Sequence, residues 1–212
     1  MRRMSDPDYV TECQNTLHDE NIAPLTQLCD SLQTSGKGTV PYVDPHYDVD
    51  QARILTLTPA PGPGTASGFL SHENDDDTSE RLIRILAAAG LTPQHTIPWT
   101  VHPWTQDGYA TNLTKDRIAA GVKPFNRFLK RVPRVVAIMA HGGEAQKLIK
   151  AFSTTIGGTV LADKAIKVFN LPALQAQSSN KKFTPEELEE QMADTYGQAM
   201  RLCGIRPLVS GN

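Results

Sequence analysis

A run of acidic residues is the densest group of side chains in this sequence that can do acid–base chemistry. Residues 72–77 read HENDDD and include Glu73, Asp75 and Asp76. A carboxylate at this place can orient a water molecule and offset positive charge that develops on a substrate. Acidic residues also favour the start of a helix, and Asp77 or the threonine after it can cap the helical run that follows. Both uses of the acids stay open at the level of sequence.

The loop that precedes these acids, PAPGPGTASGF at 59–69, has the composition of a rigid pocket wall. It has neither of the glycine spacings that mark nucleotide-phosphate loops, and Pro59, Pro61 and Pro63 remove amide donors that would cradle a phosphate. Proline fixes the backbone, and glycine lets it approach a flat ligand closely. We expect Phe69 to stack on such a ligand, with an ordinary core position as the alternative.

The cysteines do not indicate a metal centre. Cys13, Cys29 and Cys203 are far apart and odd in number, and no C-x-x-C pair occurs. This pattern argues against a zinc site or an iron–sulfur cluster held by cysteines. We expect reduced, partly buried thiols, no metal and no cofactor.

Four short β-rich runs alternate with helical ones and must position these residues. Their sequences are ARILTLT (52–58), HTIPWTV (95–101), RVVAIMA (134–140) and KAIKVFNL (164–171). Apolar and polar residues do not alternate cleanly in any of them, as is typical of strands covered on both faces. Pro98 predicts that the second strand is short or lies at an edge of the sheet. The pattern predicts an α/β fold, a three-layer αβα sandwich with a mainly parallel four-stranded central sheet. In such a sheet the ligand crevice lies outside the C-terminal ends of the strands.

Apolar residues at helical spacing predict the covering layers. The expected helices are 7–18, 21–34, 79–89, 114–131, 144–152 and 185–203. Gly121 and Pro124 predict a break or kink in the fourth of these. Gly90 is expected just beyond the third, and Thr184 and Gly204 at the two ends of the last.

Length and composition indicate a soluble protein. With 212 residues, 39% of them hydrophobic and 21% charged, the chain suits a single domain over 1–212. We expect the helices and loop of 1–50 to pack on it and 205–212 to form a tail. No apolar run approaches the roughly 18 residues of a membrane span. The sequence SDPD at 5–8 stands where a signal peptide has its apolar core, so we expect a cytoplasmic monomer with no membrane contact.

The charge balance bears on nucleic-acid binding. A formal net charge of −2 argues against a protein that coats nucleic acid, but it allows a local basic patch. One candidate is the pair Lys181 and Lys182. The second lies on the predicted 114–131 helix, where a solvated helix face is an equally good explanation: Lys123, Arg127, Lys130 and Arg131.

Five stretches of the chain occur in an order that a known family shares. They are ILTLTPAPGPGTASGF (54–69), SGFLSHENDDDTSERLIRILAAAGL (67–91), WTVHPW (99–104), RVVAIMAHGGEAQKL (134–148) and FNLPALQAQSSN (169–180). Over roughly residues 15–204 this order resembles the uracil-DNA glycosylase superfamily, especially its small members without an iron–sulfur cluster. In that superfamily the first strand runs into a Gly-Glu-Ala-Pro-Gly type motif, and a nearby aromatic residue stacks on the flipped uracil.

The resemblance implies a pocket for a flipped base, with DNA as the partner. It places Gly62 at the motif glycine and Phe69 at the stacking aromatic. The base-binding residues that we infer from it are Pro61, Gly62, Phe69, Asn74, Thr100, Gln175 and Gln177. The DNA-binding residues are Ser178, Ser179, Lys181 and Lys182.

The departures from the family pattern fall on the chemistry. The motif Glu corresponds to Pro59, the Asn that reads the uracil edge to Thr100, and the His-Pro-Ser triplet to the Ala-Leu-Gln at 173–175. The leucine that often enters the emptied base stack corresponds to Gln177. Uracil leaves as an anion, so loss of a donor aimed at it can cost roughly 3–4 kcal/mol of transition-state stabilisation. An ordinary uracil enzyme is therefore not expected.

Two functions remain. In the first, the pocket is shaped for a bulkier or modified base, such as the hypermodified cytosines of phage DNA that some superfamily members recognise. The catalytic carboxylate must then come from Glu73, Asp75 or Asp76, and His102 or His141 can replace the lost imidazole. In the second, the domain is catalytically inactive and binds DNA or a nucleotide.

Overall fold

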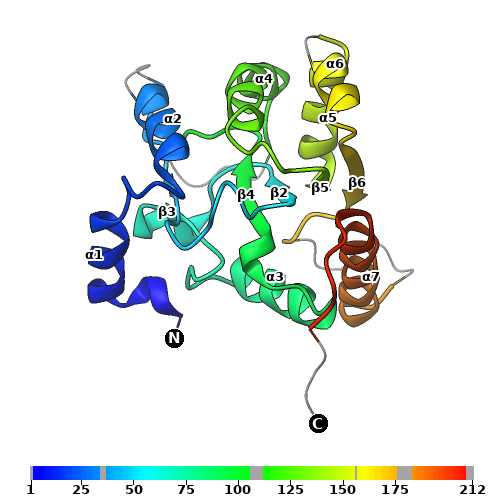
Figure 1. Ribbon diagram of the computed structural model, residues 1–212, viewed down its shortest axis with the longest axis horizontal. Helices are drawn as coiled ribbons and strands as arrows, with labels where there is room; N and C mark the ends of the chain where they lie inside the picture. The colour runs from blue at the N-terminus through cyan, green and yellow to red at the C-terminus, as the bar shows by residue number, and fades with distance from the viewer. Residues whose placement is uncertain (1, 34–36, 106–111, 156, 176–182, 209–212) are drawn as a thin grey trace.

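A four-stranded parallel sheet lies at the centre of the structure (Figure 1). The computed structural model of the chain describes residues 2–33, 37–105, 112–155, 157–175 and 183–208. The strands, in spatial order, are β4 (Thr96–Thr100), β2 (Ile54–Thr58), β5 (Ala137–His141) and β6 (Lys167–Leu171). Every neighbouring pair is parallel. The predicted four-stranded parallel sheet is confirmed, and the strand with Pro98 is the edge strand β4, as expected.

Both faces of this sheet are buried, because alternate side chains of each inner strand enter two different clusters. Leu55 and Leu57 of β2 join the larger cluster, together with Ile138 of β5. Ile54 of β2 and Met139 of β5 point the other way, into the second cluster. The apolar runs without clean alternation therefore reflect cover on both sides.

Helices cover the two faces and complete three layers. On one side lie α4 (Lys115–Leu129) and α5 (Gly142–Ser153), with α2 (Ala23–Gln33) packed against α4. On the other side lie α3 (Asp77–Ala88) and α7 (Pro185–Cys203). Figure 1 shows α2, α4 and α5 above the sheet and α3 and α7 below it. The α/β fold predicted from the strand–helix alternation is confirmed.

The remaining elements lie at the edges of this core. The helices α1 (Pro7–Asn15) and α6 (Gly157–Asp163) are short, as are the 3-10 turns η1 (Arg3–Ser5), η2 (Pro63–Ser67) and η3 (Pro93–His95). A second parallel sheet pairs β1 (Tyr42–Val43) with β3 (Phe69–Leu70). The sequence did not predict α6 or this small sheet.

The helix ends test the predicted caps. Thr184 and the Glu three residues later form a capping box on α7, and Gly204 ends it in the left-handed conformation with φ +68°, as predicted. Gly90 follows α3 with φ +71°, also as predicted. The N-cap of α3 is wrong by one residue: Asp76, not Asp77, accepts from the backbone of Ser79.

Of the break or kink expected in α4, the break is wrong, since the helix continues from 115 to 129 through Pro124. Gly121 instead allows α4 to pack closely against the sheet. A Cβ at this position would lie 1.8 Å from the carbonyl oxygen of Val101, so glycine lets α4 cross closely over the end of β4. Tertiary contact has overridden the local helix-breaking tendency. Among the described helices, none combines the length and apolar character needed to cross a membrane.

Candidate functional site

The strand order fixes where a ligand crevice is expected. From β2 the chain goes to β4 on one side and then to β5 on the other, so the direction of winding changes between β2 and β5. In parallel sheets ligands bind outside the C-terminal strand ends at this point. The loop at 59–68 leaves β2 there, and α5 begins there directly after His141.

Hydrogen bonds within the loop and to Asn74 hold the loop after β2. Gly62 accepts through its carbonyl oxygen from the backbone N and the Oγ1 of Thr65, at 3.0 and 2.7 Å. Ser67 Oγ donates to Asn74 Oδ1 at 2.8 Å, and Asn74 Nδ2 donates to the Phe69 carbonyl oxygen at 2.9 Å. Asn74 is buried by these contacts. The Asn74 amide thus links Ser67 to the backbone of Phe69 and shapes the loop between them.

A hollow of about 180 Å³ lies beside Phe69, and we call it the Phe69 hollow. An engineered cavity of about 150 Å³ accommodates benzene, so a space of this size suits a single six-membered ring. Phe69 is itself buried and packs on its other contacts against Met4, Tyr9 and Cys13. The core and pocket-wall interpretations of Phe69 therefore both describe part of its surroundings.

The other walls of the Phe69 hollow come from the first 42 residues and from the end of the loop after β4. Tyr42 is the register partner of Phe69 in the small sheet, and its hydroxyl donates to Asp30 Oδ1 at 2.6 Å. Apolar and neutral polar side chains complete the lining: Leu17, Val40 and Pro41, with Gln14, Gln33, Thr39, Thr65, Ser67 and Thr105. The sequence reasoning missed Tyr42 and these N-terminal residues, because no local motif relates them to Phe69.

Of the predicted base-binding residues that the structure describes, Phe69 lines the hollow, Gly62 and Asn74 bond to lining residues, and Pro61, Thr100 and Gln175 are not among the lining residues. Thr100 is almost fully buried, and its Oγ1 donates to the His102 carbonyl oxygen at 3.2 Å. Pro61 is buried and Gln175 is exposed. The predicted residues Gln177, Ser178, Ser179, Lys181 and Lys182 lie outside the described residues.

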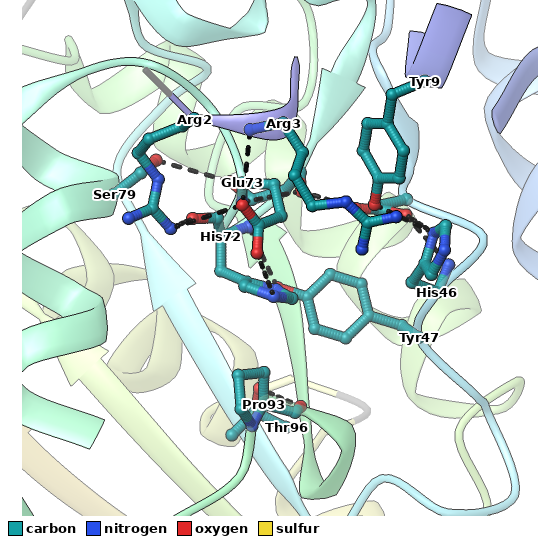
Figure 2. Close-up of polar contacts among 12 residues, drawn as sticks. Arg2, Arg3, Tyr9, His46, Tyr47, His72, Glu73, Ser79, Pro93 and Thr96 are labelled. Atoms are coloured by element: carbon teal, nitrogen blue, oxygen red, sulfur yellow. Dashed lines mark hydrogen bonds and ion pairs between the residues drawn. The ribbon is translucent and has the colours of Figure 1, made fainter. Parts of the chain in front are cut away.

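Glu73 is used to hold the N-terminus. Its carboxylate lies 3.8 Å from Arg2 Nη2, 3.5 Å from the backbone N of Arg3 and 3.5 Å from His72 Nε2. Figure 2 shows the Glu73 side chain between these three groups. The Glu73 carbonyl oxygen also accepts from the Met4 backbone at 3.1 Å. This setting explains Glu73 as an anchor for η1.

Asp75 and Asp76 differ in their contacts and in their exposure to solvent. Asp76 caps α3 by accepting from Ser79 N at 2.9 Å, and a Cβ on Gly64 would lie 1.7 Å from its Oδ2. The cap therefore also joins α3 to the loop after β2. Asp75 is exposed. Of the three predicted acids, Asp75 is thus the one that solvent or a substrate can reach most readily.

His102 is buried at the end of β4. Its Nδ1 lies 3.2 Å from the Trp104 carbonyl oxygen, which only accepts, so this nitrogen carries the hydrogen. The ring packs edge-on against the Trp104 indole at 5.0 Å. Burial lowers the pKa of His102, which favours the neutral ring.

His141 belongs to a buried relay that the sequence did not reveal. Its Nδ1 donates to the Pro172 carbonyl oxygen at 3.2 Å, and its Nε2 accepts from Tyr196 Oη at 2.9 Å. Thr56 Oγ1 in turn lies 3.1 Å from Tyr196 Oη. Complete burial lowers the pKa of His141 to about 4. The relay joins β2, β5 and α7 to the loop after β6.

The described start of that loop, residues 172–175, is held by contacts with α3 and α5. Arg81 Nη1 donates to the Leu174 carbonyl oxygen at 2.9 Å, and Arg81 Nε lies 3.1 Å from Glu189 Oε1. Gly142 has φ +86°, and a Cβ there would lie 3.2 Å from Ala173 Cβ. Ala173 thus packs directly on the start of α5.

One group of described side chains has the composition of a metal site. Cys13, Asp44 and His46 bring a sulfur, a carboxylate oxygen and a ring nitrogen within 4.8 Å of one another. Cys13 is 31 residues from Asp44 in the chain, which is why cysteine spacing could not reveal the group. The only local signal is the pair of ligand-type residues in the DPH sequence at 44–46.

A comparison with models of protein families finds no match for this chain, and a comparison with curated proteins finds none either. The family assignment therefore rests on the resemblance of the motifs and enters below as part of a proposal.

Proposed function

We propose that this protein is a DNA glycosylase that flips and excises a modified base by hydrolysing its N-glycosidic bond. The observation that carries the proposal is the Phe69 hollow, which adjoins the rigid loop after β2 and has the size of one ring. Flipping a base out of the duplex costs a few kcal/mol, and stacking on an aromatic face helps to offset it. Phe69 and Tyr42 offer such faces.

The lining favours a modified base over plain uracil. The polar groups around the hollow are amides and hydroxyls, which can bond to the edge of a base or to added hydroxyl groups. Thr100, where the family has the uracil-reading Asn, is buried and bonded to the backbone. Recognition would thus depend on Gln14, Gln33 and Thr105 in place of the family residues.

Asp75 is the acid that we assign to catalysis. Glu73 and Asp76 already make structural contacts with η1 and with α3, whereas Asp75 is exposed. A carboxylate near the sugar can orient the attacking water and offset oxocarbenium charge. His102, at the end of β4, would have to take up a proton on Nε2 before it could donate to the departing base, because its Nδ1 hydrogen is held by the Trp104 carbonyl oxygen.

The test is release of a base from defined oligonucleotides. Single- and double-stranded DNA with uracil, hypoxanthine, hydroxymethylcytosine or glucosylated cytosine is incubated with the protein, and abasic sites are cleaved with alkali. We expect cleavage with a modified cytosine and little with uracil. Thr39→Trp, which projects from an exposed position on the hollow, should reduce cleavage at least tenfold. Gln51→Trp, also exposed but away from the hollow, is the control. Robust release of uracil alone would contradict the assigned specificity.

The second candidate function is a catalytically inactive domain that binds DNA or a nucleotide. It is favoured by the structural use of Glu73 and Asp76 and by Pro59 at the place of the motif acid. This candidate predicts binding of single- or double-stranded DNA at low salt, where phosphate attraction is strongest, without abasic sites from any substrate. Absence of both binding and cleavage would rule out both functions.

A further inference from the structure

The Tyr9, Cys13, Asp44 and His46 side chains converge from two distant segments. Asp44 and His46 lie in the loop between β1 and β2, and the other two residues lie on α1. Around His46 Nδ1 stand Tyr9 Oη at 3.0 Å, Asp44 Oδ1 at 3.1 Å and Cys13 Sγ at 3.9 Å. Figure 2 shows the Tyr9 hydroxyl directed at the His46 ring.

The Tyr9 hydroxyl and the Asp44 carboxylate compete for the single Nδ1 atom of His46. If His46 Nδ1 carries a hydrogen, it donates to Asp44 Oδ1, and the Tyr9 hydroxyl cannot donate to it. If it carries none, Tyr9 can donate, but the Asp44 carboxylate then faces a lone pair at 3.1 Å. A cation in the middle of the group would attract the nitrogen, the carboxylate and a thiolate at the same time.

We propose that Cys13, Asp44 and His46 bind one zinc ion, with the Tyr9 hydroxyl or a water molecule as the fourth ligand. Thiolate, imidazole and carboxylate are common zinc ligands in proteins, and the sulfur disfavours Mg²⁺ and Ca²⁺. Bond lengths of about 2.0–2.3 Å in a tetrahedron place ligand atoms roughly 3.3–3.5 Å apart. The separations here are 3.1, 3.9 and 3.9 Å, so small side-chain shifts complete the site.

The surroundings orient the ligands. Asp44 is fully buried, and its second oxygen accepts from Ser71 Oγ at 2.5 Å. The His46 backbone N donates to Asp44 Oδ1 at 2.8 Å. The His46 side chain is 37% exposed, which leaves an entry path for the ion. Such outer-shell contacts are typical of metal-binding carboxylates.

Zinc at this place would tie α1 to the loop before β2 and, through Ser71, to the end of β3. Phe69 packs against Tyr9 and Cys13, so the ion would fix one wall of the Phe69 hollow. The inference holds whether or not the protein is a glycosylase, since it depends only on the four converging side chains.

The test is metal binding by the untagged full chain after treatment with a chelator. Zn²⁺ is titrated in competition with a colorimetric chelator, and Co²⁺ is added in parallel to record its absorption spectrum. We expect one Zn²⁺ per chain, a cobalt–thiolate charge-transfer band and the strong visible bands of tetrahedral cobalt. Cys13→Ser should abolish the thiolate band, while Cys203→Ser, at the far end of α7, should keep it.

Two further variants keep the inference testable if Cys13→Ser folds poorly. His46→Ala removes a half-exposed ligand and should weaken zinc binding more than about 100-fold, because loss of an outer-shell partner alone costs 10–100-fold. Ser71→Ala removes such an outer-shell partner and should weaken zinc binding by about 10–100-fold. The exposed His18→Ala is the control and should bind like the natural chain. Equal zinc affinity in the natural chain and His46→Ala, or cobalt spectra without a thiolate band, would overturn the assignment.

Discussion

His141 and Tyr196 form a buried pair in which the phenol donates to the imidazole, with 2.9 Å between Tyr196 Oη and His141 Nε2. The direction follows from the other ring nitrogen, which must donate to the Pro172 carbonyl oxygen. The pair thus connects β5 to α7 and fixes the backbone just beyond β6. Both side chains are fully buried, so water cannot replace the hydrogen bond between them.

Tyr196→Phe should destabilise the protein by about 1–3 kcal/mol, because it leaves the His141 acceptor buried without a donor. The measurement is the free energy of unfolding from urea titration. Thr195→Ala, one residue earlier on α7, removes a hydroxyl that bonds only to its own helix and should change stability by less than about 0.5 kcal/mol. Equal effects of the two variants would show that the relay contributes little.

The protein should lose stability as the pH falls from about 6.5 to 4. Burial holds the pKa of His141 at about 4, below its ordinary 6.5, so the unfolded chain takes up a proton that the folded chain excludes. Integrated over this window, His141 accounts for roughly 3 kcal/mol. Burial also lowers the pKa values of His72 and His102, and both add to the loss in the same direction.

The contribution of His141 is separated by comparing unfolding free energies across this pH range in two variants. His141→Gln has no group that titrates at this position, so its stability should change less with pH, although it starts lower. His18→Gln, at an exposed position, should keep the pH dependence of the natural chain. A His141→Gln profile parallel to that of the natural chain would contradict the buried neutral histidine.

Substitutions of Asp75 should affect catalysis, and substitutions of Asp76 should affect the capping of α3. Asp76→Ala removes the N-cap of α3 and should cost about 1 kcal/mol, whereas Asp76→Asn keeps a capping oxygen and should be nearly neutral. Asp75→Asn should leave stability unchanged and abolish base release, if the proposed glycosylase activity holds. Urea titration and the cleavage assay measure the two effects. Loss of cleavage in Asp76→Asn with full activity in Asp75→Asn would move the catalytic acid to Asp76.

Local patterns predicted much of the fold because the deciding interactions were themselves local. The strands are short β-branched and apolar runs, and α7 has its capping box within four residues of sequence. Prediction from local patterns failed where tertiary packing outweighs local helix propensity. Ile118 before Pro124 and Phe125 and Phe128 after it are buried, and their packing keeps α4 helical on both sides of the proline. The two glycines that begin α6 gave no helix signal, and its contact with α5 supports it.

The site was less accessible to sequence reasoning than the fold. The loop composition predicted a rigid wall, and the end of this loop does line the hollow, but the opposite wall comes from Tyr42 and the N-terminal helices. The acids were recognised as a group, yet only coordinates show that Glu73 binds Arg2 and that Asp76, not Asp77, caps α3. Contacts across 31 or more residues, such as Cys13 with Asp44, leave no periodicity to detect.

Two helical glycines should respond in opposite ways to alanine. A Cβ at Gly121 would meet the Val101 carbonyl oxygen at 1.8 Å, and this backbone atom belongs to the chain just after β4. Alanine would force α4 away from the sheet, so Gly121→Ala should cost about 3 kcal/mol.

Gly197 lies inside α7, and a Cβ there would meet only the end of the Arg201 side chain, at an ordinary 3.7 Å. Gly197→Ala should therefore stabilise the protein by about 0.5–1 kcal/mol through helix propensity. Urea titration of both variants measures the difference, with circular dichroism to verify the helix content. A neutral Gly121→Ala would mean that α4 does not cross β4 as closely as the structure has it, and a destabilising Gly197→Ala would place α7 under a constraint that its contacts do not show.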